Sequence, residues 1–265
     1  MDNIVFVVDI RDKRNQYLMQ SLIADGYIAE EYVQGMRYID AAKTYIYIFA
    51  PSTVIDKKIA DSIVKGGIVF CLDLDDEYQK YFDSIDVKVY KIFDDETLAM
   101  QNAYLTAEGT LAYIIENTNI SIKNHNILVL GYGRVGKTVT RLLKDNEVNV
   151  YVAVRSEKDM AAASVVADYV CNLENAKKHL PYFSAIVNTI PSKVIGMEEL
   201  SLINKDCFII DLASKPGGLD HKMAEELGIK TMHALGIPGK IAPKTAAEYL
   251  QASVYKKINE ILTKG

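Results

Sequence analysis

The sequence predicts an α/β protein built from two domains, each with a doubly wound parallel sheet. Three observations lead to this prediction. Short, continuously apolar segments alternate with helical patterns along the chain, which is typical of parallel strands covered on both faces. A glycine-rich turn follows one of these segments, ILVL at 127–130. The length of 265 residues and the apolar share of 49% are sufficient for two hydrophobic cores.

The first domain is expected over residues 1–94, as a flavodoxin-like α/β unit. Its strand segments are rich in β-branched and aromatic residues and are too short for helices. Strands are expected at 3–9, 44–50, 67–73 and 87–93, with helices at 12–25, 53–65 and 76–83. The next segment, 95–118, has a long helical pattern with acidic residues near its start. It is predicted to be an interdomain helix that forms one wall of a cleft.

Residues 119–244 alternate in the same way and form the predicted second domain. Its strands are expected near residues 127, 149, 168, 184, 207 and 229. Five of the six prolines follow residue 180, and they fall at strand ends, as loop residues do. The last segment, 245–265, is helical and is expected to pack back on the cleft or on the N-terminal domain.

The segment GYGRVG lies between a strand pattern and a helix pattern, which is typical of a dinucleotide-binding turn. In such a turn Gly131 forms the bend, Gly133 lets the backbone approach a pyrophosphate, and Gly136 lets helix and strand pack closely. The helix start then offers N–H groups and a positive dipole end to phosphates. The same letters with Lys137 and Thr138 also fit the P-loop pattern GxxxxGK[ST]. Gly133 and the next strand favour the Rossmann fold.

The next strand, NVYVAVRS, indicates which dinucleotide binds. NAD-preferring sites carry an acidic residue at this strand end, about 20 positions after the turn, for the ribose 2′-hydroxyl. Here Arg155 and Ser156 occupy the strand end, and Lys158 follows. Because arginine forms bidentate, charge-assisted hydrogen bonds with phosphate oxygens, this strand end favours the 2′-phosphate of NADP.

Composition excludes several classes of function. The net charge of −5 and the pI near 5.5 argue against nucleic acid as a partner. No apolar run approaches the roughly 20 residues of a spanning helix, and the N-terminus lacks a basic signal peptide. Three widely spaced cysteines and four histidines form no ligand pattern, so we expect reduced core cysteines, no metal site and a cytoplasmic protein.

Three loops should lie at the carboxyl ends of the second-domain strands, where doubly wound sheets bind ligands. They are NTIPSK (188–193), DLASKPGGLD (211–220) and HALGIPGKIAPKTA (233–246). Their small residues allow close approach, and their lysines favour an anionic substrate. The residues predicted to contact the cofactor are Gly131, Gly133, Arg134, Val135, Gly136, Arg155, Ser156, Lys158, Thr189, Ile190, Pro191, Leu212 and Ala213.

These motifs resemble those of one family. TAEG (106–109), VLGYGRVGKTV, NTIP, DLASKPGG and LGIPGKIAPKTA, in this order, are similar to the A subunit of dipicolinate synthase. The resemblance rests on motifs over roughly residues 100–250 and on architecture in the first domain. In the family the second strand usually ends in ARS or ARD, whereas this chain reads VRS, so Arg155 is retained.

The resemblance implies oxidation of a dihydrodipicolinate-type precursor to dipicolinate, pyridine-2,6-dicarboxylate, with NADP. It also implies a flavoprotein-like partner, the B subunit of the synthase, and the cytoplasm of the mother cell in a sporulating bacterium. No nucleic acid or membrane partner is expected. The oligomeric state, a homo-oligomer included, stays open.

This chemistry requires a hydride to leave the substrate, a proton to be lost and two carboxylates to be held. The expected carboxylate ligands are Lys215, Lys240 and Lys244, helped by Ser214 and Thr245. The proton acceptor is expected to be Lys215 or His233, although His233 also fits the pattern of a structural loop histidine. The joining helix is expected to contribute Asn102, Thr106 and Glu108 to the opposite wall.

Two alternatives remain at this point. GYGRVG also resembles nucleotide-sensing domains that regulate potassium transport, which move no hydride and prefer an acid at the second strand end. The second alternative is another NADP-dependent dehydrogenase that acts on a small carboxylic acid. The sequence features described above agree with it, and only the family motifs argue against it.

Overall fold

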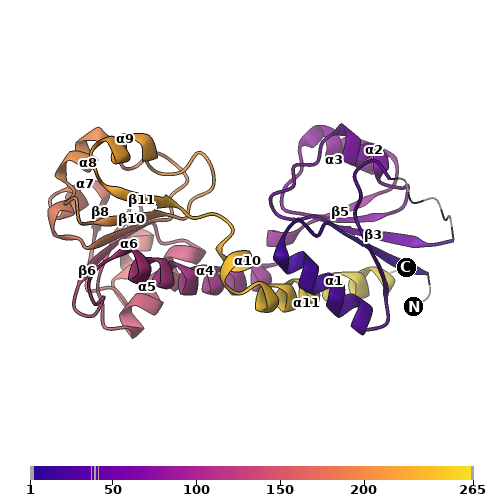
Figure 1. The fold of residues 1–265 in the computed structure, drawn as a ribbon, viewed down its shortest axis with the longest axis horizontal. Helices are drawn as coiled ribbons and strands as arrows, with labels where there is room; N and C mark the ends of the chain where they lie inside the picture. Colours follow the sequence, from indigo (N-terminus) through magenta and orange to yellow (C-terminus); the bar gives the residue numbers. More distant parts are fainter. Residues whose placement is uncertain (1–2, 37, 39, 41, 264–265) are drawn as a thin grey trace. The chain divides into compact units, whose positions relative to one another are not determined.

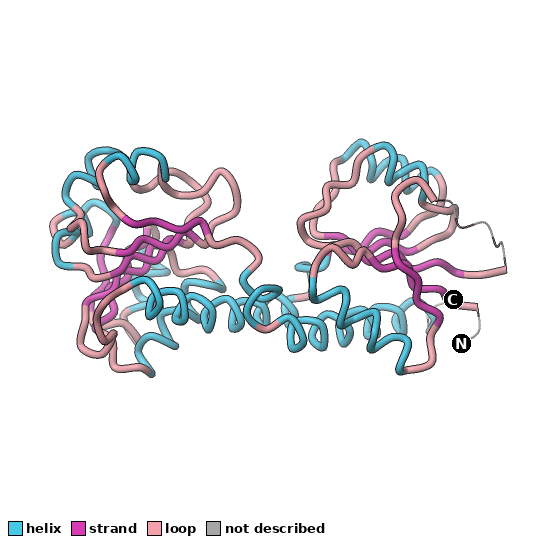
Figure 2. The backbone as a smooth tube through the Cα atoms, in the orientation of Figure 1, coloured by secondary structure: helices cyan, strands magenta, loops and turns pink. Residues whose placement is uncertain are grey.

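The computed structural model of the chain describes residues 3–36, 38, 40 and 42–263 (Figure 1). The predicted segments 1–94 and 245–265 therefore extend beyond the described residues. The chain forms two compact units, here named unit 1 (Met1–Asn102 with Pro238–Gly265) and unit 2 (Ala103–Ile237). Figure 2 shows strands and helices within each of them. Unit 1 is assembled from two separate stretches of chain, whereas unit 2 is continuous.

The sheet of unit 1 is parallel, with the strand order β2-β1-β3-β4-β5. Its strands are β1 (Ile4–Val8), β2 (Ile28–Glu31), β3 (Thr44–Ile48), β4 (Ile68–Cys71) and β5 (Lys88–Lys91). The sequence did not predict β2, because this edge strand is mostly exposed and lacks a continuous apolar run. The order reverses between β1 and β3, as in doubly wound flavodoxin-like sheets.

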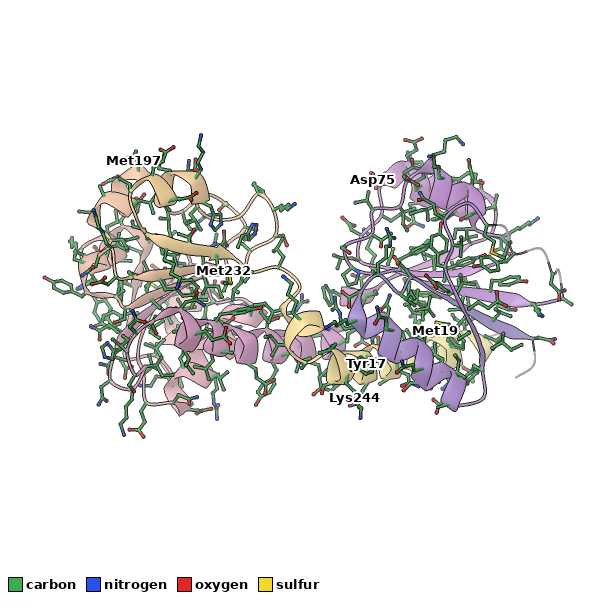
Figure 3. The ribbon with its side chains drawn as sticks, in the orientation of Figure 1. Tyr17, Met19, Asp75, Met197, Met232 and Lys244 are labelled. Atoms are coloured by element: carbon green, nitrogen blue, oxygen red, sulfur yellow. The ribbon has the colours of Figure 1, made fainter. Side chains whose placement is uncertain are left out.

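Helices cover both faces of this sheet. They are α1 (Lys13–Ala24), α2 (Lys57–Ser62), α3 (Asp76–Ser84), the 3₁₀ helix η1 (Ile92–Asp94), the start of α4 (Glu96–Asn117), and α11 (Pro243–Leu262). Leu18 and Leu22 of α1 share one core with Leu250 and Val254 of α11 and with Phe6 of β1. The two helices lie side by side in Figure 1 and again in Figure 3, in which Tyr17 and Met19 mark α1 and Lys244 marks the start of α11. The C-terminal helix therefore packs on unit 1.

The sheet of unit 2 is also parallel, with the order β11-β10-β9-β6-β7-β8. Its strands are β6 (Asn126–Leu130), β7 (Asn149–Val154), β8 (Tyr169–Asn172), β9 (Ala185–Asn188), β10 (Phe208–Asp211) and β11 (Lys230–His233). The helical elements are α5 (Arg134–Asp145), α6 (Glu157–Ala163), α7 (Leu173–Lys177), η2 (Leu180–Tyr182), α8 (Met197–Leu202), α9 (His221–Glu226) and, at the boundary, α10 (Ile237–Ile241). This is the Rossmann strand order, so the predicted fold class is confirmed.

The units divide after Asn102 and after Ile237, whereas the sequence-based divisions fell at 94, 118 and 244. Residues 238–244 cluster with unit 1 because α10 packs against the start of α1. A Cβ atom added at Gly239 would lie 2.9 Å from both Arg14 Nε and Asp12 Oδ1. The long helix α4 begins in unit 1 and continues into unit 2.

Candidate functional site

The glycine turn of unit 2 joins β6 to α5, and its three glycines differ in their surroundings. Gly131 has φ +94°, and a Cβ there would lie 2.5 Å from Thr189 Oγ1. A Cβ at Gly136 would overlap the carbonyl group of Gly131. A Cβ at Gly133 would meet no atom within 4 Å. Packing therefore requires the outer two glycines, whereas Gly133 faces open space.

The start of α5 is suited to bind an anion. Gly133 is its N-cap residue and provides no side chain to cap the helix. The first turn of this 12-residue helix contains no acidic side chain. The amide groups and the positive dipole end of α5 therefore face the open space beside Gly133.

The side chains that a P-loop would use are engaged elsewhere. Lys137 Nζ lies 5.7 Å from the centre of the Tyr132 ring. Thr138 Oγ1 donates a hydrogen bond of 2.9 Å to the carbonyl oxygen of Arg134. In a P-loop the lysine reaches the phosphates and the hydroxyl binds the metal ion. The geometry therefore favours the dinucleotide interpretation of this turn.

Arg155 lies exposed just after β7, and its Nη2 donates a hydrogen bond of 2.9 Å to Ser192 Oγ. Ser156, predicted as a phosphate ligand, is the N-cap of α6: its Oγ accepts from Asp159 N at 3.0 Å and donates to Asp159 Oδ2 at 2.7 Å. Lys158 is exposed in the first turn of α6. Arg155 and Lys158 therefore offer charge at this strand end, whereas the Ser156 hydroxyl is committed to capping.

A cavity of about 360 Å³ lies beside Arg155 in unit 2. Its apolar wall includes Leu128, Leu130, Leu180 and Ile195. Arg155, Lys193, Glu174, Lys177 and Glu199 contribute charged groups to its lining. An apolar lining with a few charged groups is typical of a small-molecule site.

Two buried polar residues end neighbouring strands of unit 2. Asn188 ends β9 and Asp211 ends β10, and both side chains are fully buried. Asn188 Nδ2 donates to Asp211 Oδ1 at 2.8 Å and to the carbonyl oxygen of Ile190 at 3.0 Å, while Asn188 Oδ1 accepts from Ile190 N at 3.1 Å. The pair thus fixes the start of the loop that contains Thr189, Ile190 and Pro191.

Asp211 also holds the loop after β10. Its Oδ1 accepts from Ala213 N at 3.0 Å, and its Oδ2 accepts from Gly218 N at 2.7 Å. Gly217 has φ +92°, and a Cβ there would lie 2.6 Å from Asp211 Oδ2. A Cβ at Gly218 would overlap the Asn188 side-chain amide. The two glycines therefore let the loop close over the Asn188–Asp211 pair.

This closure fixes the base of the loop and leaves its tip exposed. Ser214, Lys215 and Pro216 are exposed, and the Lys215–Pro216 peptide bond is cis. Leu212 is half-buried and Ala213 is buried. The predicted ligands Ser214 and Lys215 therefore project from a loop that is anchored by hydrogen bonds at both ends.

Two histidines stack near this loop, with ring centroids 5.4 Å apart and an angle of 17° between the rings. His233 Nε2 lies 2.8 Å from the carbonyl oxygen of Ala213, which can only accept, so this nitrogen carries the proton. His221 Nδ1 pairs with Thr231 Oγ1 at 2.8 Å, and its Nε2 lies 3.8 Å from Asp211 Oδ2. Burial lowers the pKa of His221, although the Asp211 carboxylate opposes this shift.

The remaining predicted residues divide between the two units. Lys240, Lys244 and Thr245 belong to unit 1, and Lys240 and Lys244 are exposed. Asn102, at the end of the first stretch of unit 1, is buried, and its Nδ2 donates to Leu98 O at 3.0 Å. Thr106 lies in unit 2, one turn further along α4, and its carbonyl oxygen accepts from Thr110 Oγ1 at 2.7 Å. The loop lysines therefore do not all belong to the unit that contains the glycine turn.

The three predicted loops follow β9, β10 and β11, but the sequence did not single out Asn188, Asp211, Gly217 and Gly218. The signal was present, because Asn and Asp end two otherwise apolar strands, AIVN and FIID. Polar residues at the carboxyl ends of adjacent parallel strands lie close together.

Among the described residues, no group of three or more His, Cys, Asp and Glu side chains is arranged to hold a metal ion. Within the same part of the chain, no helix has the length and apolar character needed to cross a membrane.

The chain is similar in sequence to one described family and to one relative. Residues 121–195 match the family described as acetohydroxy acid isomeroreductase, NADPH-binding domain. The chain is 36% identical over 174 residues to the dipicolinate synthase A subunit of Bacillus subtilis (strain 168), and the match covers 66% of this chain and 59% of that protein. These matches support a nicotinamide dinucleotide as the ligand of the glycine turn.

Two solved structures are similar over nearly the whole chain. The dipicolinate synthase A chain from Bacillus subtilis has a TM-score of 0.81 and 26% identity, covering 99% of this chain and 97% of that chain. The dipicolinate synthase A subunit from Bacillus halodurans has a TM-score of 0.80 and 24% identity, covering 96% and 97%.

Proposed function

Because this chain resembles the A subunit of dipicolinate synthase in sequence and in fold, we propose that it is the dehydrogenase component of such an enzyme. It oxidises a dihydrodipicolinate-type precursor to dipicolinate, with NADP as the hydride acceptor. The observation that carries the proposal is the glycine turn, in which Gly133 faces open space at the uncapped start of α5.

In this proposal unit 2 binds each part of the dinucleotide. The amide groups at the start of α5 hold the pyrophosphate. The cavity beside Arg155 takes the adenine, and Arg155 with Lys158 binds the 2′-phosphate. Residues 189–191 and 212–213, which follow β9 and β10, position the nicotinamide at the carboxyl edge of the sheet. When bound, NADP supplies the electrophilic ring that accepts the hydride.

The residues of the anchored loop act on the substrate. The Asn188–Asp211 pair holds this loop in one conformation, so that binding the substrate requires little further ordering. Lys215 at its tip attracts a carboxylate, and Ser214 donates a hydrogen bond. Lys240, Lys244 and Thr245 are the further carboxylate ligands in this proposal.

The proton released during aromatisation goes to Lys215 or His233. The Nε2 atom of His233 already donates to the carbonyl oxygen of Ala213, so a proton can be accepted only at Nδ1. Lys215 is exposed at the loop tip, and as the ammonium ligand of a carboxylate it has no electron pair with which to accept a proton. The contacts therefore favour Nδ1 of His233 as the acceptor.

The resemblance also supports a partner and a cellular setting for this reaction. The partner is the flavoprotein-like B subunit of the synthase, and the reaction takes place in the cytoplasm of the mother cell of a sporulating bacterium.

The function is tested by incubating the purified chain with the dihydrodipicolinate precursor and NADP, with and without the B subunit. We expect NADPH and dipicolinate to form in equal amounts. The absorbance of each product, measured separately, follows its formation. Calorimetric binding of NADP without any NADPH formation in either mixture would instead indicate a nucleotide-sensing protein. Turnover of a different small carboxylic acid, with none of the precursor, would indicate another dehydrogenase.

Replacing Arg155 with aspartate is expected to change cofactor preference. A hydrogen bond to a charged group contributes about 1.5–3 kcal/mol, so affinity for NADP should fall about 10- to 150-fold. Affinity for NAD should be unchanged or improved, because the new carboxylate can accept from a 2′-hydroxyl. Calorimetry with both dinucleotides measures the change.

Arg141→Asp is the matched control. Arg141 is also exposed in unit 2, but it lies on α5 and its Nε is 3.9 Å from Asp145 Oδ2. The Arg141→Asp variant should bind NAD and NADP with nearly the original affinities. Equal losses of NAD and NADP in Arg155→Asp would assign Arg155 a structural role only.

A further inference from the structure

The sheet of unit 1 has its own point where ligands are expected. Its strand order reverses between β1 and β3, and doubly wound sheets bind ligands outside the carboxyl ends of the strands at such a reversal. The segment DIRDKRN (9–15) follows β1, and Thr53 lies shortly after β3. None of the strand ends of unit 1 takes part in the cofactor site proposed above.

Arg11 is held rigidly at this reversal. Its Nε donates to Asp9 Oδ1 at 2.8 Å, and its Nη2 donates to Asp9 Oδ2 at 2.7 Å and to Thr53 Oγ1 at 2.9 Å. A guanidinium group has five N–H donors. These three contacts leave the two N–H groups of Nη1. The Arg11 side chain is 64% exposed, whereas that of Asp9 is 2% exposed, so one edge of the cation faces solvent.

Asp9 is fixed in turn by the strands beneath it. Its Oδ2 accepts from Ala50 N at 3.2 Å and from the Thr53 hydroxyl. Asn15 Nδ2 donates to the carbonyl oxygen of Asp9 at 2.8 Å. Burial opposes ionisation of Asp9, but the hydrogen bonds from Arg11 and Thr53 keep the pKa of this carboxyl below its ordinary value. The ion pair therefore presents Arg11 in one orientation.

A second ion pair adjoins the first. Arg14 Nε donates to Asp12 Oδ1 at 3.0 Å, and Arg14 Nη2 donates to Asp12 Oδ2 at 2.8 Å. The backbone of α10 contacts this pair at Gly239, and the exposed Lys240 follows directly. Lys13, between Asp12 and Arg14 in the chain, is exposed as well.

We propose that Arg11 binds a carboxylate of the small dicarboxylate substrate through its outer N–H groups, with Lys240 as the second cation. This inference rests on the proposed function and adds a ligand that its cofactor site does not supply. A guanidinium group already fixed by a buried carboxylate loses little side-chain entropy when it binds a second anion. A donor at a strand end of this unit is also independent of the loop that carries Lys215.

The test is calorimetric titration of the whole chain with dipicolinate. Arg11→Met should weaken binding about tenfold or more, the effect of losing a charge-assisted hydrogen bond of about 1.5 kcal/mol or more. Arg11→Lys, which keeps a cation beside Asp9, should recover part of the affinity. Lys240→Met should also weaken binding while leaving the Asp9–Arg11 pair intact. NADP affinity should stay unchanged in all three variants, and in turnover KM for the precursor should rise more than kcat falls.

Arg141→Met is the matched control, since it removes an exposed arginine from unit 2. It should bind dipicolinate as the original chain does. If the original chain binds dipicolinate and folded Arg11→Met and Lys240→Met bind it equally well, this inference is overturned and the proposed function stands. If the original chain binds NADP but neither binds dipicolinate nor oxidises the precursor, the proposed function fails and the inference fails with it.

Discussion

Gly133→Val is expected to abolish NADP binding without unfolding the protein. A Cβ at this position meets no protein atom within 4 Å, and Gly133 has φ −75°, which valine adopts readily. The added methyl groups would instead occupy the space in which the pyrophosphate approaches the start of α5. Affinity should fall by more than about 100-fold, or about 2.8 kcal/mol. Calorimetry measures the affinity, and thermal unfolding shows whether the variant is folded.

Lys205→Val is the control for this experiment. This variant also introduces a valine into unit 2, at an exposed residue that precedes β10 and does not line the cavity beside Arg155. It should retain NADP affinity. Unchanged NADP affinity in a folded Gly133→Val variant would show that the pyrophosphate does not bind at this turn.

Asp211→Asn is expected to weaken both the fold of unit 2 and its activity. Both carboxylate oxygens accept hydrogen bonds, from Asn188 Nδ2, Ala213 N and Gly218 N, so either placement of the new NH₂ group faces a donor. A buried donor left without an acceptor costs about 1–3 kcal/mol in the free energy of unfolding. The loop that carries Lys215 would also shift, and a displacement of about 1 Å can reduce the rate about 100-fold.

The measurements are the Tm of the variant and its kcat/KM for the precursor, and we expect both to fall. Asp206→Asn changes an exposed carboxylate just before the same strand and should alter neither. Wild-type Tm and kcat/KM in Asp211→Asn would show that the Asn188–Asp211 pair does not hold the loop.

Most of the fold could be predicted because the interior strands are continuous apolar runs. β6 and the helix α5 were recognised together with the glycines between them, since the spacing of those glycines reflects a backbone requirement that is local in the sequence. β2 was missed, because an exposed edge strand is stabilised by pairing with β1 rather than by an apolar pattern of its own. Its position depends on contacts between residues far apart in the chain.

The candidate site was only partly predictable for the same reason. Loop lysines are visible in a sequence, but the partner of a buried polar group is not. Asn188 and Asp211 are 23 positions apart, and Arg11 and Thr53 are 42 positions apart. Only the parallel register of neighbouring strands brings such residues together. At Ser156 the structure shows a local capping role, which the sequence prediction of a phosphate ligand did not include.

The discontinuity of unit 1 has a consequence for truncation of the chain. Unit 2 is one continuous stretch, residues 103–237, whereas the core of unit 1 is completed only by α11. Without α11, the face of the first sheet that contains Phe6 and Ile46 lacks Leu250 and Val254. A chain cleaved after residue 240 would therefore keep every strand of unit 2 but expose apolar core surface in unit 1, which favours aggregation.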